Sequence, residues 1–552
     1  MSPTDPVPGT VAPPSALGDS ILDVAELARL ANRFFSAIPG TEPAITPAQT
    51  PSPISAQTPP ATPAVSPQGF PTGTEVSAIL GHGTFGGFAP NLQGSAFPQS
   101  PSFYFLQDVR TPQPAIGVPG LKPEALKAEP SIASPALDVY LVRKDFPILQ
   151  ERVNGRQLIW LDNAATTQKP KSVIDRLTYF YEHENSNIHR AAHELAARAT
   201  DAYEGAREKV RGFINAQSAN EIVFVRGSTE AINLVAQSWG RKEIGKDDEI
   251  VISHLEHHAN IVPWQQLCAE RGAKLKVIPV DDSGQILLDE YRKLLGGRTK
   301  LVSFSQVSNA LGTITPAALM TQMAHACGAK VLVDGAQAVS HMRVDVQFLD
   351  CDFYVFSGHK LFAPTGIGVV YGKEALLNSM PPWQGGGNMI KDVTFEHTQY
   401  HVAPARFEAG TGNIADAVGL GAAIDYVTKI GMDAIDAYEH QLLVYATHLL
   451  KEIPGLRLIG TAPEKASVLS FVLDGFRTEE VGAALNREGI AVRSGHHCAQ
   501  PILRRFGLES TVRPSLAFYN TLAEVDALAG AIRRLQSGRS DDRFTRDWPS
   551  GI

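Results

Sequence analysis

The stretch Phe353-Tyr-Val-Phe-Ser-Gly-His-Lys360 leads four apolar residues directly into a short polar turn that ends in a lysine. Such a run is typical of a buried strand, and parallel sheets bind ligands just beyond the carboxyl ends of their strands. A lysine buried there can bond covalently to a carbonyl group, because burial lowers its pKa and leaves the amine nucleophilic. Taken alone, such a lysine is more often an ordinary surface residue.

Other short apolar runs share this pattern and alternate with helix-length segments. They are Leu158–Leu161, Glu221–Val225, Ile250–Ser253, Leu275–Val280, Leu301–Ser305 and Val331–Val333. The alternation predicts an α/β fold over residues 139–415, with a mostly parallel sheet and crossover helices. Residues 416–537 are expected to form a second, smaller α/β domain, and residues 538–552 a polar tail. Two placements stay open for the first segment of residues 139–415: in the large sheet, or packed with the smaller domain.

Two more strand ends carry polar groups that suit one cofactor. Asp334 follows Val331–Val333, with Gln337 one turn later, and a carboxylate against a pyridine nitrogen is what pyridoxal phosphate needs to act as an electron sink. Ser228 and Thr229 open an apolar helix whose first N–H groups can hold a phosphate. Taken alone, each feature is explained as well by an ordinary strand-end turn or helix cap. Together with Lys360 they predict a pyridoxal phosphate site.

The chain resembles the fold-type I pyridoxal-phosphate enzymes, and it is most similar to the Suf-type (group II) cysteine desulfurases, which include related selenocysteine lyases. The resemblance covers about residues 140–537. Besides the strand ends above, it is carried by Leu161-Asp-Asn-Ala-Ala165, Asn187-Ile-His-Arg190, Arg226-Gly-Ser-Thr-Glu-Ala-Ile-Asn233, Glu256-His-His-Ala-Asn-Ile-Val-Pro-Trp264, Val307-Ser-Asn309, Arg406-Phe-Glu-Ala-Gly-Thr411, Arg493-Ser-Gly-His-His-Cys498 and Arg513. It implies a large domain with a mostly parallel seven-stranded sheet and a smaller α/β C-terminal domain.

The resemblance also implies how the cofactor is held. Lys360 would bind it covalently, Asp334 would pair with the pyridinium nitrogen, Gln337 would bond the phenolate oxygen, and His257 would stack on the ring. The phosphate would be held by Thr229, Ser357, His359, the amide of Ser228 and, from the partner subunit of a homodimer, Thr411.

Substrate groups follow from the same resemblance. Asn309 and Arg513 would grip the carboxylate of L-cysteine, and Arg513 can do so through two parallel hydrogen bonds. His189, Arg190 and Arg493 would line the entrance of the site.

Cys498 is the expected nucleophile. A lone cysteine is usually a small buried hydrophobe, which is the expectation for Cys268, Cys327 and Cys351. Cys498 instead follows two histidines and lies near Arg493, a polar setting that favours the thiolate. The resemblance implies that L-cysteine becomes L-alanine, with Lys360 moving the α-proton and Cys498 taking the sulfur as a persulfide for an acceptor.

Two alternatives to this activity stay open. The first is a selenocysteine lyase, and the second is a catalytically idle scaffold protein. The intact set of Lys360, Asp334, His257 and Cys498 argues against the second, because a decayed site is expected to lose at least one of these residues.

Composition excludes several classes of protein. A net charge of −8 and a pI near 6.1 leave no basic surface for nucleic acid or for an anionic membrane. The N-terminus lacks a secretory signal, which predicts a cytoplasmic protein. The four cysteines have no zinc-ligand spacing and suggest no disulfide framework.

The first quarter of the chain has a different composition. Residues 1–140 contain 24 of the 38 prolines, so residues 1–138 are predicted to be disordered. Residues 20–38, 83–90 and 102–106 break the pattern and suggest motifs that dock on another protein, with packing on the enzyme body as the alternative. This segment resembles the cargo-loading extension of cysteine desulfurases packaged in family 2 encapsulin shells. That resemblance implies a shell-protein partner and a location inside an encapsulin nanocompartment, where sulfur would be stored or handled.

Overall fold

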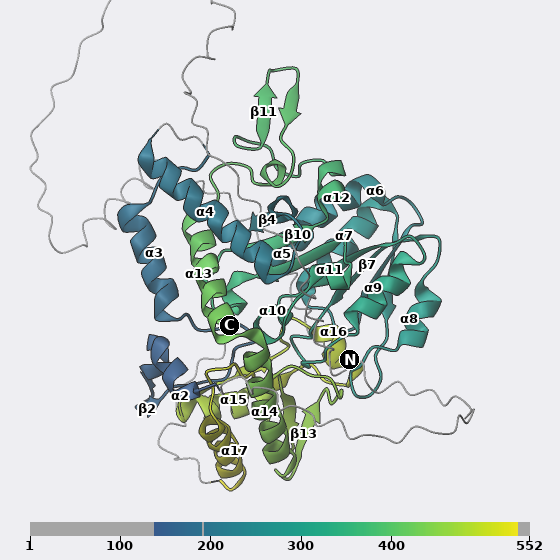
Figure 1. Ribbon diagram of the computed structural model, residues 1–552. Coiled ribbons are helices and arrows are strands. Elements are labelled where there is room, and N and C mark those ends of the chain that lie inside the picture. Colours follow the sequence, from purple (N-terminus) through teal and green to yellow (C-terminus); the bar gives the residue numbers. More distant parts are fainter. Residues whose placement is uncertain (1–136, 190–192, 539–552) are drawn as a thin grey trace, which may run out of the picture. The chain divides into compact units, whose positions relative to one another are not determined.

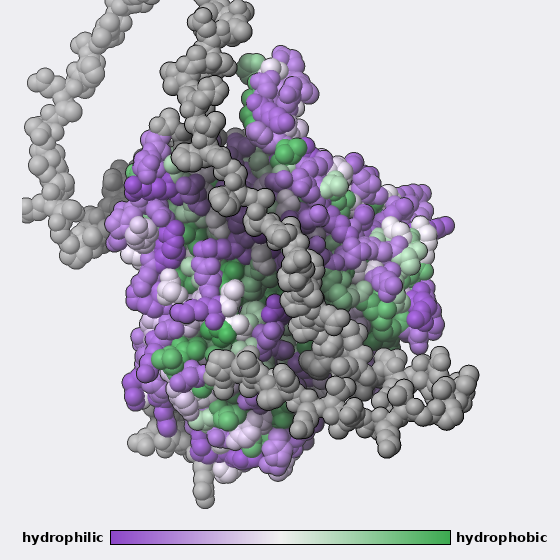
Figure 2. Space-filling model, viewed as in Figure 1, coloured by the Kyte–Doolittle hydropathy of each residue, from purple (hydrophilic) through white to green (hydrophobic). Residues whose placement is uncertain are grey.

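The computed structural model describes residues 137–189 and 193–538, all within one compact unit of the chain. Arg190, the three expected docking segments and residues 539–552 lie outside these ranges. Within the described ranges, no helix is both long and apolar enough to cross a membrane. The face visible in Figure 2 is mostly hydrophilic, with apolar residues scattered in small groups.

A mixed sheet of seven strands forms the centre of the larger domain (Figure 1). Its order is β4 (Ile222–Val225), β10 (Gly368–Gly372), β9 (Phe353–Ser357), β8 (Lys330–Asp334), β7 (Thr299–Ser305), β5 (Glu249–Ser253) and β6 (Lys274–Ile278). All neighbouring pairs are parallel except those of β10, which runs antiparallel to both β9 and β4. The expected α/β fold class is confirmed.

The first apolar run of the larger domain lies outside this sheet. The run Leu158–Leu161 forms β3 (Ile159–Trp160), which pairs in parallel with β15 (Ile490–Ala491) outside the seven-stranded sheet. The seventh strand is instead β10, which follows β9 after a short connection. Alternation of apolar runs cannot distinguish these outcomes, because it identifies strands but not their partners.

Helices cover both faces of the sheet, which explains why its central strands are apolar throughout. Val251 belongs to one hydrophobic core and its neighbours Ile250 and Ile252 to the other. The first core is shared with α4 (Glu194–Phe213), α9 (Ala317–His325), α10 (Ala338–His341), α11 (Val346–Leu349) and α13 (Ile414–Ile430). The second is shared with α5 (Ser228–Val235), α7 (Val262–Arg271) and α12 (Glu374–Ser379). Successive strand residues therefore face different helix layers.

The C-terminal region builds a four-stranded antiparallel sheet. Its order is β13 (Leu456–Ile459), β14 (Ser470–Leu473), β17 (Thr511–Arg513) and β16 (Arg493–Gly495). Helices α14 (Met432–Lys451), α15 (Thr478–Arg487) and α17 (Leu522–Gln536) share the hydrophobic core of this domain. In the register of β16 and β17, Arg493 lies opposite Arg513, so two of the expected site residues meet on one sheet.

The remaining described elements complete the two domains. They are α2 (Val139–Val142), β1 (Arg152–Val153), β2 (Arg156–Gln157), α3 (Lys171–His183), α6 (Arg241–Glu243), α8 (Leu288–Leu294), β11 (Ile390–Val393), β12 (Thr398–Tyr400) and α16 (Gln500–Arg505). Strands β11 and β12 form a hairpin that projects from the larger domain (Figure 1). Val393 on this hairpin is exposed, and Phe395 at its turn is fully exposed.

Candidate active site

A cavity opens at the carboxyl ends of several strands of the large sheet, where residues of the smaller domain also reach it. It brings together most of the side chains expected from sequence, namely Ser228, Thr229, His257, Asn309, Asp334, Gln337, Ser357, His359, Lys360, Arg493, Cys498 and Arg513. Two expected residues do not line it. Thr411 is exposed and its Oγ1 donates to Asn187 Oδ1 at 3.0 Å, whereas His189 is bonded to Glu204 through Nε2 at 2.9 Å.

Lys360 ends a single helical turn that follows β9 directly. Burial lowers the pKa of its amine to about 8, against the opposing charges of Asp334 and Cys498. The turn is anchored through the carbonyl oxygen of His359, which accepts from the backbone N–H of Thr167 at 3.0 Å and from its hydroxyl at 3.1 Å. The backbone turn that carries Lys360 is therefore fixed, and its amine is easily deprotonated.

Asp334 and Gln337 flank the same cavity. Asp334 Oδ1 accepts from the N–H of Ala336 at 2.9 Å, and burial raises the pKa of its carboxyl. A cation in the cavity would oppose that shift and keep the carboxylate ionised. Gln337 donates through Nε2 to the carbonyl oxygen of Ala164 at 2.7 Å. Between them, Gly335 is required because a Cβ would lie 2.0 Å from the ring of the buried Tyr354.

The start of helix α5 forms a cradle of hydroxyl and amide groups. The N–H of Ser228 donates to Ser357 Oγ at 2.9 Å, and the two serine hydroxyls are also 2.9 Å apart. Gly368 on β10 packs against this turn so closely that a Cβ there would lie 2.5 Å from the Cα of Gly227. Hydroxyl groups and the positive end of a helix are suited to a phosphate group.

His257 presents a neutral ring to the cavity. Burial lowers its pKa to about 3, and the nearby charges of Lys360, His258 and Arg513 add to the effect. Its Nδ1 accepts from the N–H of Ala259 at 3.0 Å, so the proton of the neutral ring lies on Nε2. An uncharged, oriented imidazole is suited to stacking on an aromatic ring.

Arg513 is the best-placed group for a carboxylate. It is almost completely buried, and it donates through Nη1 to the carbonyl oxygen of Asn309 at 2.9 Å and through Nη2 to Asp162 Oδ1 at 3.1 Å. Its Nε and the Oδ1 of Asn309 have no hydrogen-bond partner. Buried polar atoms without partners are costly, so these groups indicate a place for a polar ligand.

Cys498 lies on a loop that is held from both sides. His497 and Cys498 both adopt left-handed conformations, with φ of 53° and 54°. The N–H of Cys498 donates to His496 Nδ1 at 3.0 Å, and the His497 ring lies 2.8 Å from the Thr511 hydroxyl. Two successive left-handed residues without glycine cost energy, so their surroundings must hold the loop in this shape. Cys498 is only partly buried, unlike Cys268 and Cys351.

Several residues that organise the site were not assigned roles from sequence. Asp162 lies between Arg513 and Arg493, with its Oδ2 3.5 Å from Arg493 Nε. Glu256 is fully buried behind His257, and burial raises its pKa to about 7. Asp162 contacts two expected site residues, and Glu256 directly precedes a third. In the sequence, the available signal was that each is a charged residue close to the end of a short apolar run.

The residues present fit pyridoxal phosphate. They supply an amine of lowered pKa, a buried carboxylate, a hydroxyl and amide cradle, and a neutral imidazole around one cavity. The fit rests on the chemistry of these groups and on the unpaired Arg513 Nε, which leaves room for a carboxylate beside the cofactor.

Comparison with known proteins agrees with this chemistry. The aminotransferase class-V family matches residues 159–528. A cysteine desulfurase of Synechococcus elongatus is 72% identical over 74% of this chain and 65% of its own length, and a probable cysteine desulfurase of Mycobacterium leprae is 65% identical over 73% and 66%. The match thus spans about two thirds of these relatives. A cysteine desulfurase of Dickeya dadantii is 54% identical over 71% of this chain and 96% of its own.

Solved structures give the same result. The cysteine desulfurase CsdA of Escherichia coli superimposes with a TM-score of 0.68 at 39% identity, covering 73% of this chain and 99% of that one. The apo cysteine desulfurase of Thermococcus onnurineus gives 0.70 at 38% identity, with coverage of 74% and 100%. The chain therefore belongs to the aminotransferase class-V family of fold-type I, pyridoxal-phosphate-dependent enzymes.

Proposed function

We propose that this protein is a cysteine desulfurase of the Suf type, which converts L-cysteine to L-alanine and leaves a persulfide on Cys498. The observation that carries the proposal is that Lys360, Cys498 and Arg513 line one cavity. An amine, a thiol and a guanidinium are the groups needed to move the α-proton, accept the sulfur and hold the carboxylate. The names of the relatives support the same activity.

When bound, pyridoxal phosphate supplies the electron sink for cleavage at the substrate's α-carbon. Arg513 and Asn309 would orient the substrate carboxylate, His257 would cover the cofactor ring, and Asp334 would hold the charge of the pyridine nitrogen. Lys360 takes the α-proton through its neutral amine. The Cys498 thiolate then attacks the substrate sulfur, the bond between that sulfur and Cβ breaks, and Cβ takes up a proton. Alanine leaves, and the sulfur remains on Cys498.

The fate of the persulfide follows from the loop that carries it. The Cys498 loop is short and bonded to its surroundings, so it is poorly suited to carrying sulfur over a distance. We infer that a separate sulfur-acceptor protein comes to the site. A short, fixed loop of this kind also supports the assignment to the Suf-type subgroup.

We further propose that the enzyme is a homodimer. Thr411 lies outside the cavity of its own subunit, which is the placement expected of a residue that reaches the phosphate of the partner. The β11–β12 hairpin is mostly hydrophilic (Figure 2), but it exposes the apolar or aromatic side chains of Val393, Phe395 and Tyr400, and Val402 just after it is also exposed. Exposed apolar side chains on a projecting hairpin support contact with a second subunit. Light scattering of the purified protein measures the state directly, and a monomer at micromolar concentration contradicts this proposal.

The N-terminal extension is proposed to load the enzyme into an encapsulin shell. Its composition and its three aromatic and apolar segments support a tether that binds a repetitive wall at several weak sites. Co-expression with a shell protein, followed by purification of the shells, tests the idea. Deletion of residues 1–130 is expected to abolish co-purification, and unchanged co-purification would overturn the proposal.

The activity itself is tested by measuring alanine released from L-cysteine. The wild-type protein is expected to be coloured and active, whereas Lys360→Ala loses both the bound-cofactor absorption and the activity. Cys498→Ser keeps the absorption and loses alanine release from L-cysteine. A colourless wild-type protein, or a fully active Cys498→Ser variant, would overturn the assignment. Parallel assays with L-selenocysteine show whether the enzyme also accepts the selenium substrate.

A further inference from the structure

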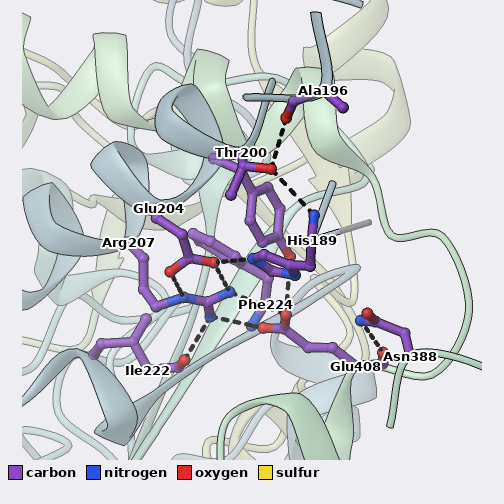
Figure 3. Close-up of polar contacts among 10 residues, drawn as sticks. His189, Ala196, Thr200, Glu204, Arg207, Ile222, Phe224, Asn388 and Glu408 are labelled. Carbon is purple, nitrogen blue, oxygen red and sulfur yellow. Dashed lines mark hydrogen bonds and ion pairs between the residues drawn. The ribbon is translucent and has the colours of Figure 1, made fainter. Parts of the chain in front are cut away.

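A buried ion pair joins Arg207 of α4 and Glu408 beside Ile222 and Phe224 of strand β4 (Figure 3). Their side chains meet through two parallel hydrogen bonds, Nη1 to Oε1 at 2.7 Å and Nη2 to Oε2 at 3.0 Å. Both side chains are almost inaccessible, with exposures of 2% and 7%. Glu204 adds a second, more exposed carboxylate, which accepts from Arg207 Nε at 2.8 Å. Tyr203 donates its hydroxyl to Glu408 Oε2 at 3.1 Å.

This pair occupies the free edge of the seven-stranded sheet. Strand β4 is the outermost strand and pairs only with β10. On its other edge, the N–H of Phe224 donates to Glu408 Oε1 at 2.8 Å, and the carbonyl oxygen of Ile222 accepts from Arg207 Nη1 at 2.8 Å (Figure 3). An edge strand leaves such groups unpaired unless something covers it. The ion pair therefore supplies the acceptor and the donor that another strand would have provided.

The same pair joins segments that carry residues assigned to the cofactor phosphate. Strand β4 ends three residues before Ser228, so its position sets that of the Ser228 and Thr229 cradle. Glu408 itself lies three residues before Thr411. Its carbonyl oxygen also accepts from Asn388 Nδ2 at 3.1 Å, which anchors the start of the Thr411 segment.

We propose that Glu408, held by Arg207, is a positioning residue that fixes the phosphate-binding groups on both sides of the subunit interface. It acts through β4 on Ser228 and Thr229, and through its own backbone on Thr411. The inference rests on the proposed function, because it takes these residues to bind the phosphate of pyridoxal phosphate. Neither Arg207 nor Glu408 lines the cavity of its own subunit, so we assign them a role through the residues that they hold.

A purely structural role makes a different prediction from a positioning role. If the ion pair only stabilised the fold, its loss would lower the thermal stability and leave the ligand preference of the folded protein unchanged. If the ion pair positions the residues that bind the phosphate, its loss weakens the binding of pyridoxal phosphate but not the binding of pyridoxal. Pyridoxal, which has the same ring and aldehyde but no phosphate, separates the two cases.

The test uses apoprotein prepared with hydroxylamine and titrated with each ligand by absorbance. For Glu408→Gln, Kd for pyridoxal phosphate is expected to rise about tenfold, the scale on which residues behind a ligating side chain alter affinity in metal sites. Kd for pyridoxal is expected to change less than about twofold. Glu204→Gln is the matched control, because it removes a carboxylate from the same arginine without touching β4 or the Thr411 segment, and both constants should stay at the wild-type values.

Each other outcome has a defined meaning. A folded Glu408→Gln variant with the wild-type ratio of the two constants overturns the inference. If that variant does not fold, Arg207→Lys replaces it, since lysine keeps the charge but cannot make two parallel bonds. The same rise in the ratio is then expected, and an unchanged ratio overturns the inference. A wild-type protein that binds neither ligand contradicts the proposed function instead.

Discussion

The carbonyl oxygen of Cys498 accepts a hydrogen bond of 2.8 Å from the backbone N–H of His258. His258 belongs to the large domain and directly follows His257, whose imidazole faces the cavity. Cys498 belongs to the smaller domain. A second bond, from Asn309 Nδ2 to the carbonyl oxygen of His497 at 2.7 Å, joins the same two parts. The expected nucleophile is thus tied at two points to the domain that carries Lys360, although 138 residues separate them in sequence.

Selective alkylation of the native protein checks the special status of Cys498. Burial raises the pKa of Cys268 from 9.0 to about 11, which leaves about 100-fold less thiolate at neutral pH, and Cys351 is buried completely with a raised pKa. We therefore expect iodoacetamide to modify Cys498 well before these two. Peptide mapping by mass spectrometry at increasing times measures the order. Labelling of Cys268 or Cys351 at the same rate would contradict the expectation, and denatured protein is the control.

Replacement of Arg513 tests how the substrate carboxylate is held. Arg513→Lys keeps the positive charge, but its single ammonium nitrogen cannot reproduce the planar guanidinium that contacts Asn309 and Asp162 and leaves Nε for a ligand. KM for L-cysteine is expected to rise at least about tenfold, because one charge-assisted hydrogen bond contributes about 1.5–3 kcal/mol. Cofactor absorption should remain. Arg505→Lys, whose guanidinium contacts the highly exposed Asp282, is the matched control. An unchanged KM in Arg513→Lys would remove it from the carboxylate site.

The pH dependence of cofactor attachment reports on Lys360. Its pKa is lowered from 10.5 to about 8, so the amine becomes neutral as the pH rises through 8. Addition to an aldehyde needs the neutral amine, so the rate of pyridoxal phosphate incorporation into apoprotein should rise from pH 6 to 8 and level off above about 9. Stopped-flow absorbance measures the rate. A rate that keeps rising to pH 10 would mean an unperturbed lysine.

Asp334→Asn gives this experiment a second arm. The carboxylate of Asp334 opposes the effect of burial on Lys360, and its removal should move the midpoint of the pH profile below 8. The direction of the Lys360 pKa shift also determines how the free energy of unfolding depends on pH. Folded Lys360 binds fewer protons than the unfolded chain between pH 8 and 10.5, so its burial cost declines as the pH rises through that window. A midpoint that moves above 8 in Asp334→Asn would contradict the electrostatic account.

Much of the fold and most of the cavity could be predicted from sequence, because both depend on local signals. Buried strands are apolar over four or five residues, and polar residues follow them at a single edge of the sheet. The sequence left open whether Leu158–Leu161 joins the main sheet or packs with the smaller domain, and it could not identify β15 as its partner, because pairing depends on contacts distant in sequence.

The charged residues that hold the site in place were harder to predict for the same reason. Arg207 and Glu408 are separated by 201 residues, and each resembles an ordinary charged residue in its own segment. Only the folded chain shows that they meet at the free edge of β4. Thr411 and His189 likewise depend on segments placed around the cavity rather than in it.

Glu256 provides a test of the buried network behind His257. Its Oε2 accepts from Asn260 Nδ2 at 2.6 Å and from the Ser305 hydroxyl at 2.7 Å, and its Oε1 accepts from the Ser305 N–H at 3.1 Å and from the Ser253 hydroxyl. The orientation of Asn260 is fixed because its Oδ1 accepts from Trp264 Nε1 at 2.8 Å. In Glu256→Gln, the amide NH₂ must therefore face either Asn260 Nδ2 or Ser305 N–H, both of which are donors.

We expect Glu256→Gln to lower the free energy of unfolding by about 1–3 kcal/mol, the cost of a buried donor left without an acceptor. Burial raises the pKa of Glu256 from 4.5 to about 7, so its folded form binds a proton more tightly than the unfolded chain does. Its contribution to stability is therefore largest below pH 4.5 and falls as the pH rises through 7. The difference in Tm between wild type and variant should be larger at pH 5 than at pH 8.

Ser303→Ala is the control for this prediction. It removes only one of the two donors to Asn260 Oδ1 and should have a smaller effect on Tm at both pH values. Equal Tm values for Glu256→Gln and wild type at pH 5 would show that Glu256 does not organise this part of the site.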